Sequence, residues 1–248
     1  MLLNAETAIS TSTVLLVPYS KWHVPRYHEW MKDEEIQEAT ASEPLSIEEE
    51  YTMQQSWRQD PDKLTFIVCL PTPSAQQAQG IPDPLSAEDD SPERMVGDIN
   101  LFLRVDDGEE GDSDPQIIGE IELMIAEKKN QRKGFGRAAL LAFLRYIVDH
   151  EKDILTEFVN RDTMASELLS TRASAAWKFS CLSVKIGQAN VRSLALFESV
   201  RFAKVADEPN YFGEFELRRT DLGREWIDEA HGRAGVNGYA VLSYGRKN

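Results

Sequence analysis

The segment from residue 119 to residue 148 constrains the fold most strongly, because it joins a strand, a short loop and a helix. At its start two sets of residues interleave: Glu120, Glu122, Met124 and Ala126 with Ile121, Leu123 and Ile125. An alternation of period two predicts a strand with two different faces. Further on, apolar residues recur at helical spacing, at Leu140, Leu141, Leu144, Ile147 and Val148. The segment therefore predicts a strand that leads through a loop into an amphipathic helix.

The loop between strand and helix carries two glycines among basic residues. It reads Gln131, Arg132, Lys133, Gly134, Phe135, Gly136, which fits the spacing Gln/Arg-x-x-Gly-x-Gly. Glycines let a backbone approach a ligand without an intervening Cβ atom, and a helix start offers unpaired N–H groups to an anion. Arg132, Lys133 and Arg137 add positive charge at the same place. We therefore expect this loop to bind a pyrophosphate.

The loop fits an anion site better than an ordinary turn or a dinucleotide-binding or Walker loop. Taken alone, its spacing also fits a glycine-containing turn, but the flanking strand and helix favour the anion site. Dinucleotide-binding folds need a G-x-G-x-x-G turn, whose glycines follow another order, and the Gly-Lys-Ser/Thr of a Walker loop is absent from the sequence.

A second strand and helix lie further along the chain. Residues Phe179–Ile186 read as a strand, and Asn190 is a suitable N-cap for the helix after it. One face of that helix carries Leu194, Phe197 and Val200. In these two segments the chain resembles the GCN5-related N-acetyltransferase (GNAT) superfamily. Its acetyl-CoA loop has the pattern of residues 131–136, and its next helix has an Asn-x-x-Ser/Ala-x-x-Leu-Tyr pattern and ends Gly-Phe, matched here by Asn190, Ser193, Leu196 and Phe202.

The resemblance implies a fold and a cofactor site. The fold would be of the mixed α/β (α+β) class, with a central, mostly antiparallel sheet of about seven strands, splayed between the fourth and fifth and flanked by helices. Acetyl-CoA, the cosubstrate, would lie in that opening, with a backbone N–H near Met124 aimed at the thioester oxygen. The cofactor-binding residues would be Met124, Ile125, Ala126, Gln131, Arg132, Lys133, Gly134, Phe135, Gly136, Arg137, Asn190, Ser193 and Phe197.

Two glutamates are the candidates for the catalytic base. By resemblance to the superfamily's lysine acetyltransferases, Glu120 holds the position of their catalytic glutamate. Glu122 lies on the same face of the strand, one step closer to the thioester. Neighbouring carboxylates raise each other's pKa, which suits a base that works near neutral pH. Either glutamate is alternatively a solvated edge residue or a binder of the substrate ammonium. The tyrosine that often protonates the leaving thiolate is replaced here by Phe197.

A narrower resemblance covers most of residues 13–218. It is to the α/β-tubulin N-acetyltransferase family (N-acetyltransferase nine), and it rests on Val17–Tyr19, His23–Met31, Thr40–Leu45, Glu50–Tyr51, Ser56–Trp57, Val96–Leu103, Gly119–Glu122, Met124–Glu127 and Lys185–Gln188. It implies acetylation of the α-amino termini of α- and β-tubulin.

Composition narrows the remaining possibilities. The net charge of −15 argues against a nucleic-acid partner, which needs a basic face. An apolar run long enough to cross a membrane and a secretory signal are both absent from the sequence. Cys69 and Cys181 lie in apolar strands, so we expect buried free thiols in a reducing cytoplasm, and we expect no metal site. The sequence leaves the oligomeric state open.

The 248 residues are expected to form one acetyltransferase domain. Two insertions are predicted, a flexible loop at 71–93 and a helical segment at 151–178, with a loosely ordered tail from about Gly232. Further strands are predicted at Val14–Val17, Leu64–Leu70, Met95–Val105, Phe202–Val205 and Tyr211–Arg219. Helices are predicted at Val24–Glu35 and Ser46–Gln59, the second with a capping box at Ser46 and Glu49.

The leading hypothesis is thus an acetyl-CoA-dependent transferase that acetylates a protein α-amino terminus, with tubulin as the implied acceptor. The same chemistry is open to a lysine side chain, a ribosomal-protein N-terminus or a small amine. A third possibility is an acetyl-CoA-binding, microtubule-associated protein with little turnover.

Overall fold

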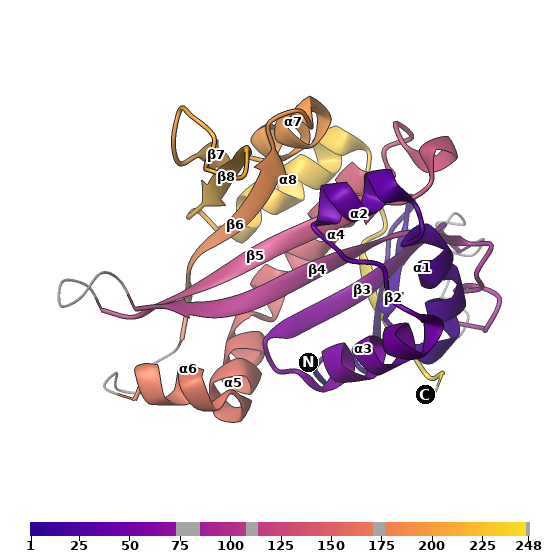
Figure 1. The fold of residues 1–248 in the computed structure, drawn as a ribbon, viewed down its shortest axis with the longest axis horizontal. Coiled ribbons are helices and arrows are strands. Elements are labelled where there is room, and N and C mark those ends of the chain that lie inside the picture. Colours follow the sequence, from indigo (N-terminus) through magenta and orange to yellow (C-terminus); the bar gives the residue numbers. More distant parts are fainter. Residues whose placement is uncertain (73–84, 108–113, 171–176, 247–248) are drawn as a thin grey trace.

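The computed structural model describes residues 1–72, 85–107, 114–170 and 177–246 (Figure 1). Within this part of the chain one sheet of nine strands runs in the order β7-β8-β6-β5-β4-β3-β2-β1-β9. The strands are β1 (Thr7–Ser10), β2 (Leu15–Pro18), β3 (Lys63–Cys69), β4 (Met95–Asp106), β5 (Gln116–Ile125), β6 (Phe179–Gly187), β7 (Ala203–Lys204), β8 (Glu214–Arg219) and β9 (Ala240–Ser243). All neighbouring strands pair antiparallel except β5 and β6.

The parallel pair β5–β6 separates part-way along its length. Pairing starts at Ile117 with Phe179 and ends at Glu120 with Ser183, although β5 continues to Ile125 and β6 to Gly187. This is the splay that the sequence resemblance implied between the fourth and fifth predicted strands. Beyond Glu120 the two strands no longer satisfy each other's backbone groups, so the opening presents free N–H and C=O groups.

Helices cover both faces of the sheet (Figure 1). They are α1 (Val24–Trp30), α2 (Glu34–Thr40), α3 (Ile47–Gln59), α4 (Phe135–Asp149), α5 (Glu151–Arg161), α6 (Thr163–Leu168), α7 (Val191–Ser199) and α8 (Arg224–Ala234), with short 3₁₀ turns η1 (Lys21–His23) and η3 (Lys128–Asn130). The period-two alternation divides the sheet residues between two cores. On one face Phe66 packs edge-on against Phe143 and Tyr146 of α4. On the other, Ile67 belongs to the core that contains Tyr27 and Trp30 of α1.

The strand and helix predictions around both motifs are confirmed. The loop helix is α4, the helix after Asn190 is α7, and Ser46 caps α3 in a capping box with Glu49. The prediction of one continuous helix over Val24–Glu35 is wrong, because the segment contains α1 and the start of a separate helix, α2. Asp33 lies in an extended conformation between α1 and α2, and its carboxylate accepts a hydrogen bond from the N–H of Glu35 at 2.9 Å.

The expectation of a loose tail from Gly232 is wrong. Helix α8 runs to Ala234, and β9 pairs with β1 from Ser243 opposite Thr7 to Ala240 opposite Ser10. Tyr244 is also buried. Together β1 and β9 account for the two strands beyond the expected seven. The pairing orders the tail because it joins backbone groups at opposite ends of the chain.

The two predicted insertions differ in outcome. Of the expected flexible loop at 71–93, residues 73–84 lie outside the described residues. Its second part is not loose, because Asp90 is buried and holds four hydrogen-bond partners. The segment 151–178 is helical as predicted, with residues 171–176 outside the described part, and Ile154 and Phe158 of α5 join the core beneath α4.

Candidate active site

A cleft lies where β5 and β6 separate. It has an empty volume of about 930 Å³, is open to solvent and is walled by residues of α1, α2, α3, β4, β5, β6, α7 and β8. Six of the residues predicted from the sequence line it: Glu120, Glu122, Met124, Asn190, Ser193 and Phe197. The fold thus brings both carboxylates of β5 and the start of α7 into one cleft. Ile125, Ala126 and residues 131–137 lie outside the lining of this cleft.

Glu120 is held in an ion pair. Its Oε2 atom lies 2.9 Å from Nζ of Lys185, which projects from β6 across the opening. The sequence ranked Glu120 first as the base, but this carboxylate already accepts a hydrogen bond from the ammonium group of Lys185. The ion pair suits Glu120 to binding or positioning and leaves Glu122 as the other candidate base.

Glu122 has the electrostatics of a base near neutral pH. Desolvation raises its pKa to about 7, and the negative charges of Asp98 and Glu120 add to the effect, while Lys185 opposes it. Its side chain is exposed at the mouth of the cleft, so water screens part of this effect. A carboxylate with a pKa near 7 can accept a proton from a substrate at neutral pH.

Sequence reasoning missed two polar residues of the cleft floor. Asp98 and Asn100 lie on β4, and the antiparallel register pairs Asp98 with Met124 and Asn100 with Glu122. Both side chains are only 3% exposed. The signal was present in the sequence, because two polar residues alternate with apolar ones in a strand otherwise read as core.

The backbone of β5 explains how the opening offers hydrogen-bond donors. The N–H of Ala126 donates to the carbonyl of Val96 at 3.0 Å. Along an antiparallel strand the backbone N–H groups of successive residues point alternately to one neighbouring strand and to the other. The N–H groups of Leu123 and Ile125 therefore face away from β4, toward the gap left by β6. The expected N–H near Met124 is thus offered by its two neighbours. Gly97 on β4 is required here, since a Cβ atom at this position would lie 1.9 Å from the carbonyl oxygen of Met124.

The basic loop continues from the end of β5. The side chain of Gln131 donates to the carbonyl of Ile125 at 3.1 Å, which attaches the loop to the strand. Gly134 has a φ of 87°, a conformation that favours glycine, and it supplies no side chain to cap α4. The first N–H groups of α4 are therefore open to an anion.

The charges of the loop are uncompensated. Arg132, Lys133 and Arg137 are exposed, and within the described residues none of them makes an ion pair. In a protein of net charge −15, three cations without an ion pair beside an uncapped helix start have the charge and the free N–H donors that phosphate groups require. Phe135 and Gly136 are half-buried at the start of α4 and connect this site to the core.

Helix α7 supplies the far wall of the cleft. Asn190 caps it, with Oδ1 accepting from the N–H of Ser193 at 3.1 Å. Phe197 lines the cleft but is buried and packs edge-on against Phe202. The structure therefore confirms the N-cap role of Asn190. Phe197 has no hydroxyl group that could donate a proton into the cleft.

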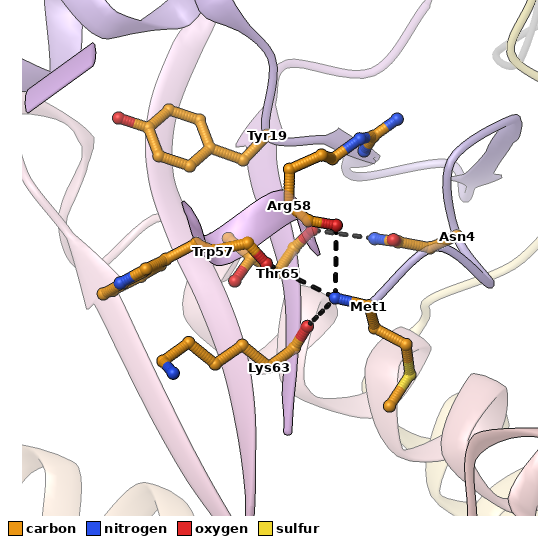
Figure 2. A pocket seen from close by; sticks show the side chains of 7 residues that line it. All are labelled: Met1, Asn4, Tyr19, Trp57, Arg58, Lys63 and Thr65. Atoms are coloured by element: carbon orange, nitrogen blue, oxygen red, sulfur yellow. Dashed lines mark hydrogen bonds between the residues drawn. The ribbon is translucent and has the colours of Figure 1, made fainter. Parts of the chain in front are cut away.

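A second, smaller depression surrounds Met1 (Figure 2). The amino group of Met1 lies among carbonyl oxygens at the end of α3 and donates to the carbonyl oxygen of Lys63 at 2.7 Å. The side chain of Asn4 donates to the carbonyl oxygen of Thr65 at 2.8 Å. This region anchors the first residues to α3 and β3. In the described ranges there is no helix able to span a membrane and no His/Cys/Asp/Glu cluster able to hold a metal ion.

Comparison with known proteins agrees with this geometry. Residues 13–203 match the family model described as an acetyltransferase (GNAT) domain. The chain is also 40% identical over 232 residues to the human alpha/beta-tubulin-N-acetyltransferase 9, covering 92% of this chain and 91% of that protein. The chain belongs to the GNAT acetyltransferases and, within them, to the N-acetyltransferase 9 family.

Other members extend the match in sequence and in structure. An N-acetyltransferase 9-like protein of Schizosaccharomyces pombe is 38% identical over 239 residues, covering 89% of this chain and 100% of that protein. A GNAT-family acetyltransferase from Bacillus anthracis superposes with a TM-score of 0.54 at 13% identity, over 87% of this chain and 99% of that one. Spermidine N-acetyltransferase from Vibrio cholerae, solved with CoA and spermine, superposes with a TM-score of 0.52 at 14% identity, over 84% of this chain and 94% of that one. The solved structures show that the fold is that of the GNAT enzymes.

Proposed function

We propose that this chain transfers an acetyl group from acetyl-CoA to the α-amino group of a protein N-terminus, and that tubulin is the acceptor. The observation that carries the proposal is Glu122, an accessible carboxylate with a pKa raised to about 7 at the opening between β5 and β6. Family membership supports acetyl transfer, and the names of the human, mouse and Drosophila relatives support tubulin.

The residues present fit acetyl-CoA. Its pyrophosphate would bind at the uncapped start of α4 beside Arg132, Lys133 and Arg137, as residues 131–137 predict. Its pantetheine arm would follow the free edge of β5 at Met124–Ala126 toward the cleft, with Asn190 and Ser193 on the opposite side. When bound, acetyl-CoA supplies the thioester whose carbonyl carbon the amine attacks.

The chain's own groups would do three things. Glu122 takes the proton from the incoming ammonium, directly or through a water molecule. The N–H groups of Leu123 and Ile125, which face the opening, donate to the acyl oxygen where negative charge develops. Glu120, fixed by Lys185, holds the acceptor near Glu122. Phe197 has no proton to give, so it could not protonate a leaving thiolate, and that proton would have to come from water.

An α-amine is easier for Glu122 to deprotonate than a lysine side chain. An α-ammonium group has a pKa of about 8, close to that of Glu122, whereas a lysine ammonium group lies at about 10.4. Proton transfer to Glu122 is thus unfavourable by roughly one pKa unit for the terminus and by more than three for lysine. A protein N-terminus therefore gives up its proton to Glu122 more readily than a lysine side chain does.

A thiol-release assay tests the proposed acceptor. Peptides with the N-terminal sequences of α- and β-tubulin are compared with the same peptides blocked at the α-amine and with a blocked lysine peptide. We expect release of CoA with the free termini only. Turnover on lysine or a small amine alone would reassign the acceptor, and acetyl-CoA binding without any turnover would favour the non-catalytic, microtubule-associated role.

The cofactor site is tested separately. Replacing Arg132 and Lys133 by alanine removes two cations from the phosphate site, so we expect the KM for acetyl-CoA to rise about tenfold, with kcat changed little. Lys152→Ala, an exposed change on α5, is the matched control and should leave the KM unchanged. An unchanged KM in the loop variant would contradict the phosphate role of this loop.

We also propose a cytoplasmic location, supported by two buried free cysteines. We propose a protein acceptor and neither nucleic-acid nor membrane partners, because a net charge of −15 would repel polyanions.

A further inference from the structure

We propose that Asp98 is a positioning residue for the reaction: its buried negative charge sets the proton affinity of Glu122, and Tyr27 and Asn100 hold Asp98 in its charged form. The inference rests on the proposed role of Glu122 as the base. It adds a residue whose effect on the reaction is exerted through Glu122.

The register of β4 and β5 places the two carboxylates together. Asn100 is directly opposite Glu122, and Asp98 is two residues from Asn100 on the same face of β4. Such diagonal neighbours in an antiparallel pair have backbone positions about 7–8 Å apart. Both residues line the same cleft. At that separation, with Asp98 buried and Glu122 open to the cleft, each negative charge opposes ionisation of the other.

Asp98 is buried without a cation. Its Oδ2 atom accepts from Nδ2 of Asn100 at 2.9 Å and from the hydroxyl of Tyr27 at 3.3 Å. Desolvation raises its pKa to about 6, and the hydrogen bonds from Asn100 and Tyr27 limit the rise. Asp98 is therefore mostly ionised at neutral pH, although it makes no ion pair within the described residues.

The charged and titratable groups around this pair come from every neighbouring element: Glu120 on β5, Lys185 on β6, Glu214 on β8, Tyr27 on α1, and Tyr19 and Glu50 beside Tyr27. The one cation among them, Lys185, is engaged with Glu120. Tyr19 and Tyr27 have raised pKa values because of burial, so both hydroxyls are neutral here, and that of Tyr27 donates to Asp98. Asp98 thus acts on Glu122 without a neutralising partner.

Asn100 gives the pair a second link. Its Nδ2 donates to Asp98, and its Oδ1 is buried and has no hydrogen-bond partner among the described residues. That oxygen lies on the residue directly opposite Glu122. An unsatisfied buried acceptor favours a nearby proton donor, and protonated Glu122 is such a donor. Asp98 and Asn100 therefore both favour the protonated form of Glu122 after it has taken the proton.

The pH dependence of kcat/KM tests the inference. Asp98→Asn keeps the size of the side chain and an oxygen acceptor for Tyr27 and Asn100, but removes the charge. We expect the acidic limb of the profile to move about one pH unit lower in this variant, in line with the Coulomb energy at this separation. Tyr27→Phe removes a donor to Asp98 and makes it easier to protonate, so a smaller shift in the same direction is expected. Glu216→Gln, on the same sheet face but paired with Arg218, should leave the limb in place.

A second readout does not depend on turnover. Carbon-13 NMR of labelled glutamate carboxyl groups follows the titration of Glu122 in the full-length protein without acetyl-CoA, with the signal assigned by its loss in Glu122→Gln. The midpoint should fall in Asp98→Asn and stay in Glu216→Gln. An unchanged midpoint and limb in folded Asp98→Asn would overturn the inference while leaving Glu122 as the base. A wild-type profile without a limb that depends on Glu122 would instead overturn the proposed function.

Discussion

Two buried aspartates of this protein have opposite chemistry. Asp90 and Asp98 are 1% and 3% exposed. Burial alone raises the pKa of both, yet that of Asp90 is lowered to about 2, because hydrogen bonds from His23, Tyr244 and Trp22 outweigh burial. Asp98 receives two hydrogen bonds from neutral groups, and its pKa rises to about 6. The larger number of donors to Asp90 and the stronger desolvation of Asp98 together separate a structural carboxylate from one able to influence catalysis.

The partners of Asp90 explain its structural role. Trp22 donates to it at 2.9 Å and Nε2 of His23 at 3.1 Å, while Nδ1 of His23 accepts from the N–H of Ser20. This network assigns the proton of the neutral imidazole to Nε2. Tyr244 and Arg246, beyond β9, bind the same carboxylate, with Arg246 at 2.8 Å. Asp90 thus fastens the C-terminal segment to η1.

The largest effect is expected at the carboxylate that titrates near neutral pH. Glu122→Gln removes the base but keeps the shape of the side chain, so we expect kcat to fall by about 10²- to 10⁴-fold, with acetyl-CoA binding retained. Steady-state kinetics and a binding titration measure the two quantities. Activity within threefold of the wild type would show that the raised pKa of Glu122 has no catalytic meaning.

The next largest effect concerns Asp90. In Asp90→Asn an amide NH₂ replaces an oxygen that accepts from three donors, so we expect a loss of about 3 kcal/mol of unfolding free energy at pH 7. The folded pKa lies below the usual value of 3.8, so the contribution of the charge is present above about pH 4 and is lost as the pH falls toward 2. Denaturant unfolding at pH 7 and pH 3 measures this. A destabilisation equal at both pH values would contradict the ionic role.

Asp98 should show the reverse pH dependence. Its folded pKa is raised above 3.8, so its contribution to stability is present below about pH 4 and is lost as the pH rises through 6. We expect Asp98→Asn to be more stable than the wild type at pH 8 by about 2 kcal/mol, with little difference at pH 4. If the variant is instead less stable at pH 8, the carboxylate is better satisfied than its two donors indicate.

The smallest effect is expected at Glu120. Glu120→Gln frees Lys185 and removes a charge near Glu122, so we expect kcat to change less than about tenfold and the KM for the acceptor peptide to rise. The same kinetic assay as for Glu122→Gln measures both. A loss as large as that of Glu122→Gln would restore Glu120 as the base, the order that the sequence favoured.

The sequence predicted local features well and long-range ones poorly. The alternation in β5, the glycines of the loop and the capping box at Ser46 each depend on residues a few positions apart, and all three are found. The pairing of β1 with β9 was missed, because each strand has four residues and the two lie at opposite ends of the chain. Short segments of this kind give little periodic signal.

The same limit applies to the site. Glu120 was predicted by family resemblance and Glu122 by strand alternation, but their ranking depended on Lys185, which lies 65 positions from Glu120. Asp98 and Asn100 looked like interruptions of a core strand until the register placed them beside Met124 and Glu122. Propensity and spacing carry no information about such neighbours, because strand pairing decides which charges meet.

The most direct test of the role of Glu122 is the pH dependence of kcat/KM for acetyl transfer to a free tubulin N-terminal peptide, compared between the wild type and Glu122→Gln. We predict a wild-type rate that rises with pH through an acidic limb near 7, and a variant that is slower and lacks this limb. A variant that keeps both the limb and the rate would contradict the assignment of Glu122 as the base.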